Sequence, residues 1–560
     1  MSDPSPPSPP PEFPPVEPTN FDLIVIGTGL SQSVIAAAAS TAGKTVLHLD
    51  PNPFYGSHFS SLSLPELSSF LLSAPSQPSH SSPISDEYDV VPLSSRPLYS
   101  DVEISALPTE LEDCSRRFCF DVSGPRVLFC ADSAIDLLLK SGVNHYLEFK
   151  SVDVSLIYDG ESGKFSSVPG SRAAIFNDKS LSLIEKLTLM GFFKLVQKHL
   201  GGEGEDVISE EDLESPFVEF LNKFRLNKNP LNQKIKWIIL YAIALADYDQ
   251  ENLEVCKDLL KTKDGINRLA LYHSSIGRFP NAPGAMLYPM YGQGELPQAF
   301  CRRAAVKGCI YVLRMPVAAL LADKGSGLYR GVRLASGQDL FSHQLLIDPQ
   351  FVIPQALALS KSGSLQVNSQ NSIPKDIKMK VARGICITRT SLKSDALNLL
   401  IVYPPRSLYP EQVTSVRVLQ LGSNSAVCPV GMFVLHLSSF CDDANQGKKL
   451  LKAAVDALFK QPSSVISEIK SSETPEDNSV DQGAVTEEEK PALVWTASYL
   501  QEITEESVST ISSSPCPDGN LSYNNLIDTT KKMFEQMFSG EEFFPDAPED
   551  PDNVEDSAPE

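Results

Sequence analysis

A glycine-rich turn near the N-terminus constrains the fold of this 560-residue chain more than any other feature. Residues 21–27 are typical of a buried strand, residues 31–42 of an alanine-rich helix, and residues 45–50 of a second buried strand. A strand, a helix and a strand in this order form a βαβ unit, and such units build parallel sheets. We therefore predict an α/β fold that begins with a parallel sheet.

The turn itself, Gly27-Thr28-Gly29-Leu30-Ser31-Gln32, follows part of the dinucleotide-binding pattern. In that pattern two glycines allow a tight turn and close approach to the pyrophosphate, and a third lets the helix pack on the strand. An acidic residue about 20 positions later binds the ribose. Gly27, Gly29 and Asp50 satisfy the pattern, whereas Gln32 places a long side chain where the third glycine stands. Two interpretations stay open: a true nucleotide site, or the same fold without its ligand.

The formal net charge of −23 is concentrated in three segments. Residues 1–20, 461–492 and 541–560 carry most of it, and the last of these contains nine acidic and no basic residues. The rest of the chain is close to neutral and has no concentrated basic face, so we exclude nucleic acid as the main partner. We predict a disordered proline-rich tail over 1–20, an acidic linker over 461–492 and an acidic tail over 545–560.

Several classes of protein are excluded by what the sequence lacks. The longest strongly apolar run, Trp237–Ala246, is half of the roughly 20 residues needed to span a bilayer. The N-terminus does not have the basic and apolar regions of a secretory signal. The ten cysteines form no C-x-x-C pair, which is typical of free thiols in a reducing compartment. We therefore expect a soluble, cytosolic protein.

The sequence contains no motif of a catalytic centre. P-loop, H-E-x-x-H and G-x-S-x-G patterns are absent, and no metal-ligand spacing occurs. His48 and His436 lie within apolar strand patterns, where a buried core histidine is the simplest interpretation. We predict neither a catalytic residue nor a metal site.

An apolar helical region interrupts the α/β pattern over residues 169–276. Within it we predict helices at 180–200 and 234–246. Their apolar positions cover more than one face, which indicates helices that are buried on most sides or line an apolar cavity. The region is therefore predicted to be an all-helical subdomain.

The other segments complete the predicted organisation. Residues 57–110 are rich in Ser and Pro and read as a surface insertion outside the core. Residues 21–168 and 277–460 form one discontinuous domain, on which residues 493–544 pack as a C-terminal segment.

Three polar residues are candidates for contacting a partner. Tyr55 follows the second strand, and Glu295 and Arg302 lie on a helix after the glycine-rich loop 287–294. Because Glu295 and Arg302 are seven residues apart, they project from the same helix face. An ordinary solvated face would show the same pattern.

Several segments together resemble the Rab GDP-dissociation inhibitor and Rab escort protein family. They are Gly27–Leu30, Val46–Gly56, Tyr146–Lys150 and Tyr288–Gln298. The resemblance implies the fold of FAD-dependent oxidases without a flavin or any other cofactor, in agreement with Gln32. It also implies a non-catalytic function: binding of GDP-bound Rab GTPases, unprenylated or prenylated, and their delivery to membranes.

The resemblance assigns roles to particular residues. Tyr55, Glu295 and Arg302 match the platform that contacts the Rab switch regions. The helical subdomain 169–276 matches the part that shelters the geranylgeranyl lipid. The insertion 57–110, the linker 461–492 and the acidic C-terminus resemble the escort branch of the family, in which the protein is an accessory subunit of Rab geranylgeranyltransferase.

Two further positions concern the α/β heterodimer of this transferase. Phe176 matches the phenylalanine that inserts into the transferase, whereas Leu187 stands where an arginine supports that contact. The loss of a charge-assisted donor worth roughly 1.5–3 kcal/mol predicts weaker or rearranged transferase binding. The alternatives are a Rab GDP-dissociation inhibitor without a transferase role and, on Gly27, Gly29 and Asp50 alone, a flavin-dependent amine-oxidase-like enzyme.

Overall fold

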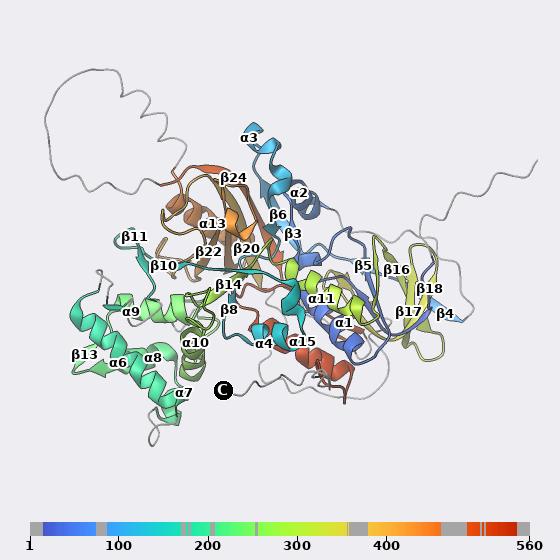
Figure 1. Ribbon diagram of the computed structural model, residues 1–560, viewed down its shortest axis with the longest axis horizontal. Helices are drawn as coiled ribbons and strands as arrows, with labels where there is room; N and C mark the ends of the chain where they lie inside the picture. Colours follow the sequence, from blue (N-terminus) through green and yellow to red (C-terminus); the bar gives the residue numbers. More distant parts are fainter. Residues whose placement is uncertain are drawn as a thin grey trace, which may run out of the picture.

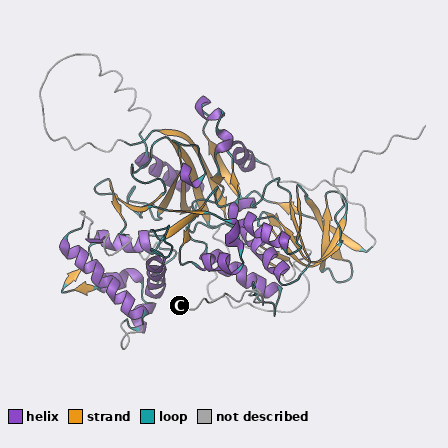
Figure 2. Ribbon diagram, viewed as in Figure 1, coloured by secondary structure: helices purple, strands orange, loops and turns teal. Residues whose placement is uncertain are grey.

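Two large sheets and a separate group of helices make up the molecule (Figure 1). The computed structural model describes residues 15–73, 87–169, 175–176, 181–201, 208–252, 256–354, 357, 379–460, 490–503, 507–508 and 511–545. Figure 2 shows one group of helices gathered at the lower left. The predicted α/β fold with mixed sheets and an inserted helical subdomain is confirmed.

The first sheet has nine strands and is parallel at its centre. Its order is β15 (Ile310–Leu313), β2 (Val46–Asp50), β1 (Asn20–Ile26), β18 (Asp339–Ile347), β17 (Tyr329–Leu334), β16 (Val317–Asp323) and β4 (Tyr88–Pro92), with β25 (Ser507–Val508) and β26 (Ile511–Ser513) beside β18. Strand β1 pairs in parallel with both β2 and β18, which confirms the predicted βαβ unit. Every residue of β2 is buried, as expected for a parallel strand covered on both faces.

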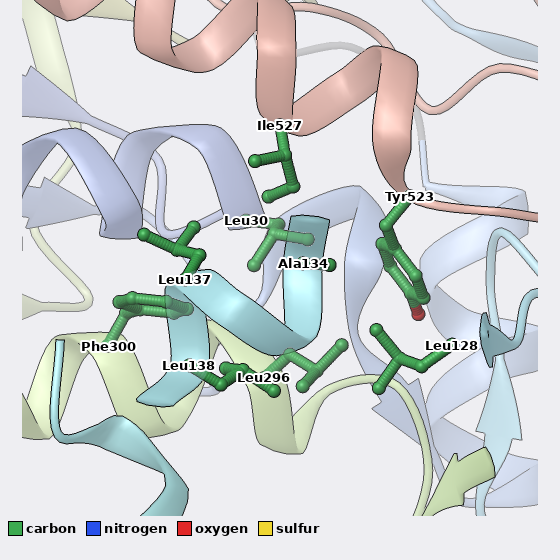
Figure 3. A pocket seen from close by; sticks show the side chains of 9 residues that line it. All are labelled: Leu30, Leu128, Ala134, Leu137, Leu138, Leu296, Phe300, Tyr523 and Ile527. Atoms are coloured by element: carbon green, nitrogen blue, oxygen red, sulfur yellow. The ribbon is translucent and has the colours of Figure 1, made fainter. Parts of the chain in front are cut away.

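Four helices cover one side of this sheet: α1 (Leu30–Thr41), α4 (Ser133–Lys140), α11 (Glu295–Val306) and α15 (Asn524–Met537). Their apolar faces meet around a cavity of only about 10 Å³ (Figure 3). Leu30, Leu137, Phe300 and Ile527 point into it, one from each helix. A cavity of this size has room for at most one water, so the four helices are closely packed and hold α11 firmly on α1.

The second sheet has eight strands and is almost entirely antiparallel. Its order is β11 (Lys164–Ser167), β10 (Val154–Asp159), β21 (Leu399–Tyr403), β22 (Val416–Gly422), β23 (Phe433–Cys441), β20 (Lys380–Thr388), β24 (Leu493–Glu502) and β6 (Tyr99–Ile104). Helix α13 (Ala444–Leu458) packs on it. His436 of β23 and His48 of β2 are fully buried in the two sheets, as predicted.

Short strands connect these parts. β8 (Leu128–Phe129), β14 (Met286–Pro289) and β9 (Phe149–Ser151) form a three-stranded sheet, while β3 (Ser61–Leu62) pairs with β7 (Phe120–Asp121), and β5 (Ser94–Ser95) pairs with β19 (Phe351–Val352). Two short helices, α2 (Leu64–Leu72) and α3 (Thr109–Glu112), lie near them.

The prediction that residues 57–110 form a surface insertion is wrong for the described parts, 57–73 and 87–110. Strand β4 pairs with β16 at the edge of the first sheet, and β6 pairs with β24 at the edge of the second. Leu67 and Leu93 are buried. Edge strands need an apolar residue on only one face, so Ser and Pro between the apolar positions hid them from the sequence pattern.

The helical group contains α6 (Leu183–Leu200), α7 (Glu210–Glu214), α8 (Phe217–Lys223), α9 (Gln233–Trp237), a π-helical turn (Ile238–Ile243) and α10 (Thr262–Ser275). It also contains a hairpin of β12 (Arg225–Leu226) and β13 (Asn229–Pro230), so the expectation of an all-helical subdomain is wrong in this detail. Asn227 and Lys228 both have positive φ, which is the geometry of a two-residue hairpin turn. Among the described helices, none is long and apolar enough to cross a membrane.

The predicted tails lie mainly outside the described residues. Residues 1–14, 461–489 and 546–560 are not described. Residues 15–20 belong to the folded part, because Val16 is buried and exchanges two hydrogen bonds with the side chain of Gln338 at 2.8 and 2.7 Å. The predicted C-terminal segment packs on the first sheet through α15.

Candidate functional site

The glycine-rich turn has the geometry of a dinucleotide-binding loop. Gly27 has φ +97°, and a Cβ there would lie 2.8 Å from the side chain of Asp348, so only glycine fits. The chain then enters α1 directly after Gly29, which is the helix N-cap. The Nε2 of His48 lies 2.6 Å from the carbonyl oxygen of Gly27 and braces the turn from β2.

The side chains around this turn do not fit a dinucleotide. Gln32 is buried, and a Cβ added to Gly29 would lie only 2.5 Å from its Oε1. The Gln32 side chain therefore occupies the space in which a pyrophosphate would approach the backbone of Gly29. Asp50 is also buried, and its Oδ2 accepts hydrogen bonds from the backbone N–H and the hydroxyl of Thr28 at 2.8 and 2.6 Å. The carboxylate that would bind a ribose is thus engaged within the protein, and Gln32 fills the space in front of Gly29.

Asp348, at the end of β18, connects the turn to the segment after β2. Its carboxylate accepts hydrogen bonds from Ser57 Oγ at 2.5 Å and Gln32 Nε2 at 3.3 Å, and pairs with His58 Nε2 at 3.0 Å. Burial alone would raise the pKa of Asp348, but the charge and hydrogen bond of His58, together with the hydrogen bond from Ser57, hold this pKa below its ordinary value. This buried polar cluster joins the turn to β18 and to the segment after β2.

A second buried carboxylate fixes the start of α11. Asp121 Oδ1 accepts from Ser61 Oγ at 2.6 Å and from the backbone N–H of Gln293 at 2.9 Å, while its Oδ2 accepts from Tyr288 at 2.6 Å. Gly292 must lack a side chain here, because a Cβ would lie 2.3 Å from Ser61 Oγ. The glycine-rich loop is therefore clamped on β3 and β7, and α11 begins at a fixed position.

Helix α11 presents Glu295 and Arg302 in different environments. Glu295 is half-buried at the first position of the helix, and burial raises its pKa. Arg302 is exposed, and its guanidinium carbon lies 4.5 Å from the centroid of the Tyr146 ring. Within the part of the chain that the structure describes, neither side chain forms an ion pair or a hydrogen bond, so both charges are available to a partner.

Tyr55 lies beside the same helix. Its ring packs edge-on against Tyr311 with centroids 6.2 Å apart. Burial and the neighbouring Cys301 of α11 raise the pKa of its hydroxyl. The structure therefore brings Tyr55 to α11, together with Glu295 and Arg302; we call these three residues and Tyr146 the platform.

An apolar pocket of about 270 Å³ adjoins the platform. Tyr146 ends a 3₁₀ turn (Val143–Tyr146), and Asn144 and Leu147 on either side of Tyr146 line the pocket. The remaining wall comes from α4, β9, β14 and the loop before β14: Ile135, Leu138, Leu139, Phe149, Ser151, Phe279, Asn281, Ala282 and Leu287. Its size and lining suit one or two apolar side chains of an extended peptide.

Sequence reasoning missed this pocket. The chain forms a 3₁₀ turn over 143–146 and only then β9, a path without a periodic pattern in the sequence. A signal was nevertheless present, because Leu137, Leu138 and Leu139 are consecutive in a helix that can bury only one stripe. Leu139 is in fact exposed and lines the pocket.

The helical group carries a second surface. Phe176 is 49% exposed, and its carbonyl oxygen accepts a hydrogen bond from Lys186 Nζ of α6 at 2.7 Å. Three apolar side chains in the first turns of α6 are also exposed: Leu183 by 67%, Ile184 by 58% and Leu187 by 48%. We call these four residues the apolar α6 face.

This surface corrects the prediction that the helix at 180–200 is buried on most sides. Only Thr188, Leu189, Phe192 and Val196 of α6 are buried. The helix begins with a capping box in which Ser182 and Glu185 each bond the other's backbone N–H, so the exposed turn is well ordered. The apolar positions outside the buried stripe therefore face the surface.

Comparison with known proteins identifies the family. The profile of the family described as GDI, GDP dissociation inhibitor, matches residues 18–93 and 87–490. Rab escort protein 1 of Arabidopsis thaliana is 54% identical over 551 residues, which cover 95% of each chain. The chain belongs to the GDP dissociation inhibitor family. The resemblance stated from the sequence is thereby confirmed.

Other similar proteins are more distant. The Drosophila melanogaster protein named Rab proteins geranylgeranyltransferase component A is 29% identical, over 96% of this chain and 92% of its own. The crystal structure of Rab GDI from Plasmodium falciparum has the same fold, with a TM-score of 0.63 and 17% identity over 93% of this chain and 98% of that one. An oxidoreductase from Methanosarcina mazei shares the fold more loosely, with a TM-score of 0.50 and 11% identity over 92% of this chain and 99% of its own.

Proposed function

We propose that this protein is a Rab escort protein, the accessory subunit that presents Rab GTPases to Rab geranylgeranyltransferase. It binds the GDP-bound, unprenylated Rab protein, holds it while the transferase attaches geranylgeranyl groups, and keeps the lipidated product soluble until delivery to a membrane. The transferase carries out the chemistry. The protein itself contributes binding surfaces and works in the cytosol.

The observation that carries this proposal is the apolar α6 face. A protein that only extracts Rab proteins from membranes needs one interface with the GTPase, and four large apolar side chains exposed on a second surface would be a liability. Their position around Phe176 supports docking of the transferase there. The absence of an arginine at position 187 makes this contact apolar.

The platform supports the Rab-binding part of the proposal. Glu295, Arg302 and Tyr55 offer a carboxylate, a guanidinium and a hydroxyl along one helix, and the described structure does not use the two charges. Such a set suits polar and charged side chains of a GTPase switch region. The adjoining pocket suits apolar side chains in the extended C-terminal segment of the same Rab protein, which leads to the prenylated cysteines.

The core of the helical group supports the lipid-binding part. It is mainly apolar, with Phe192, Phe217 and the π-helical turn among its buried residues. Gly265 of α10 lies against Phe217, whose ring would be 2.5 Å from a Cβ at that position. Burial of a C20 isoprenoid is favourable by roughly 25 cal/mol per Å² of apolar surface, so displacement of core side chains such as Phe217 can be compensated by the lipid.

Reconstituted prenylation tests the proposal. The transferase, geranylgeranyl pyrophosphate and a GDP-bound Rab protein are combined with and without this protein, and lipid transfer to the Rab protein is measured. We expect transfer to depend on the protein and to fall strongly with F176A. Equal transfer in its absence would contradict the escort function.

The same variant separates the two closest functions. In a Rab GDP-dissociation inhibitor without a transferase role, Phe176→Ala changes neither Rab binding nor any transferase contact. In an escort protein it strongly weakens transferase binding and leaves Rab binding intact. The flavin-dependent alternative lacks support, since Gln32 and Asp50 do not fit a dinucleotide; purified protein with a visible flavin absorbance band would restore it.

A further inference from the structure

The last turns of α11 carry a strip of basic side chains. Arg303 and Lys307 are four residues apart and adjoin on the helix surface, and Arg302 lies about 100° around the helix from Arg303. Arg302 and Lys307 are exposed. None of the three forms an ion pair within the described ranges, and the Nε of Arg303 is buried without a hydrogen-bond partner there. We call these residues the basic strip. A cluster of three unpaired cations attracts an anionic partner.

The topology places the basic strip at a defined edge of the first sheet. Helix α1 leads into β2, and α11 leads through Gly308 into β15, which is parallel to β2. Both helices therefore end at the amino-terminal edge of the same parallel strands. Lys44, just after α1, and Lys307, just after α11, both belong to this edge.

The C-terminal segment is anchored at the same edge. Glu541 pairs with Lys44 at 2.6 Å, and Glu542 pairs with Lys140 at the end of α4 at 2.9 Å. Phe544 is buried, and its ring packs on Phe300 of α11 with centroids 6.2 Å apart. The described chain therefore ends, at Pro545, against the helix that carries the basic strip.

The sequence that follows is complementary in charge. Residues 546–560 contain seven acidic and no basic residues. Fifteen residues extend up to roughly 50 Å, ample to return from Pro545 to the last turn of α11. We propose that this acidic segment of the same chain occupies the basic strip in the free protein.

Attachment to the same chain favours this occupant over a separate one. A segment tethered next to its site has an effective concentration on the order of millimolar, so weak contacts suffice. Ion pairs at an exposed strip are individually worth at most about 1 kcal/mol and are screened by salt. The contact is therefore reversible and sensitive to ionic strength.

Because Arg302 belongs to both the basic strip and the platform, the acidic segment and a Rab protein compete for this side chain. Only this consequence rests on the proposed function.

Zero-length crosslinking of the full chain tests the proposal without any Rab protein. A carbodiimide joins a carboxylate to an amine in direct contact, and peptide mapping of the monomeric fraction identifies the pair. At low ionic strength we expect amide links between residues 546–560 and Lys307, reduced about tenfold at high salt. Links from residues 546–560 only to Lys44 or Lys140 would overturn the proposal.

Two sets of variants make the result specific. The double variant R302E/R303E keeps the Lys307 amine and should lose the crosslink about tenfold, whereas K324E/R330E, at exposed positions near the opposite edge of the sheet, should keep it. An unchanged yield in R302E/R303E would contradict the proposal.

A second measurement does not depend on altering the folded part. Replacement of the seven acids of residues 546–560 by Asn and Gln should raise the reactivity of Lys307 toward an amine-acylating reagent several-fold, with Lys324 as the internal reference. Equal reactivity of Lys307 in both proteins would also overturn the proposal.

Discussion

At the scale of single residues, Arg302 combines an uncommitted charge with a fixed position. Its guanidinium rests on the Tyr146 ring at 4.5 Å, which orients the exposed side chain before any partner arrives. A prealigned arginine loses little conformational entropy on binding, and its charge-assisted hydrogen bonds contribute roughly 1.5–3 kcal/mol.

We therefore expect Arg302→Ala to weaken binding of a GDP-bound Rab protein by about tenfold or more, measured by titration of a fluorescent Rab protein. Thermal unfolding should be unchanged, because the side chain is exposed. Arg330→Ala, at an exposed arginine of β17, is the matched control and should bind like the unaltered protein. Undiminished affinity of the Arg302 variant for the Rab protein would refute the proposal that the platform binds it.

The buried His48 predicts how the stability of the fold depends on pH. Burial lowers its pKa from 6.5 to about 4, because the charged ring cannot be solvated inside the sheet. Between these pH values the unfolded chain binds a proton that the folded chain does not, so acidification destabilises the fold. His48→Gln removes this contribution while its amide can still donate to Gly27.

Relative to the unaltered protein, the His48→Gln variant should therefore gain about 2 kcal/mol of unfolding free energy between pH 7 and pH 5. Denaturant unfolding at the two pH values measures the gain. Burial raises the pKa values of Asp50 and Asp132 to about 6, which acts in the opposite direction, but both groups are present in both proteins and cancel in the comparison. A constant difference between the two proteins at both pH values would contradict the assignment.

The glycine-rich turn shows how far single residues could be read from the sequence. Gly27 and Asp50 occupy the predicted positions at the ends of β1 and β2, since spacing along a βαβ unit fixes them. Gln32 was recognised as a departure, but its contact with Asp348, more than 300 positions later, depends on the parallel pairing of β1 with β18. No local pattern contains that pairing.

At the scale of elements, the apolar α6 face determines how the transferase contact responds to salt and mutation. Phe176, Leu183, Ile184 and Leu187 are all exposed and uncharged, so the contact gains its free energy from burial, which ions do not screen. We expect the transferase affinity to change little between low and physiological salt, by surface plasmon resonance or calorimetry. Steep salt dependence would show that charged residues dominate instead.

Substitutions within α6 sharpen this expectation. Leu187→Asp should weaken transferase binding more than tenfold, because a buried leucine contributes roughly 1.5–3 kcal/mol and a carboxylate must be desolvated. Leu200→Asp is a matched control, since Leu187 and Leu200 are both 48% exposed on the same helix but lie at opposite ends. Comparable losses from both variants would argue against docking at the apolar α6 face. A titration of Leu187→Arg shows whether the missing charge also matters.

Helices and strands with a clear hydrophobic pattern were predictable from the sequence. Strands that exist only through pairing with a distant strand were not. β1, α1 and β2 follow from alternating blocks of apolar residues and a glycine turn. By contrast, β4 and β6 are recognised as strands only through β16 and β24, which lie hundreds of residues away. The π-helical turn over 238–243 appeared as a plain helix, because its sequence is uniformly apolar and has no period.

At the scale of the whole molecule, the two proposed interfaces lie far apart. Helix α6 is at the outer side of the helical group, whereas α11 packs on α1 next to the first sheet (Figure 1). In this view α10, the short sheet with β8 and β14, and α4 lie between them. The helical group is also tied to the second sheet by buried contacts. Arg417 of β22 pairs with Asp247 at 2.8 Å, and Ser415 donates its backbone N–H to the carbonyl of Asp247 at 2.7 Å.

This separation predicts that a Rab protein and the transferase bind simultaneously and, at the level of direct contacts, independently. Phe176→Ala should leave the affinity for the Rab protein unchanged, and Arg302→Ala should leave the affinity for the transferase unchanged. The losses of free energy caused by mutations at distant sites with no shared partners add within about 0.3–0.5 kcal/mol. The double variant should therefore lose a free energy of ternary-complex assembly equal to the sum of the losses in the two single variants.

A double-mutant cycle on the ternary complex provides the measurement, with both single variants and the double variant titrated under one buffer condition. A coupling free energy above about 1 kcal/mol would show that the two interfaces communicate. The path for such coupling would be the buried Arg417–Asp247 pair, because it joins the helical group to the second sheet. R417K, which retains the charge but not the planar geometry, would then reduce the coupling, whereas it would have no effect if the two surfaces act separately.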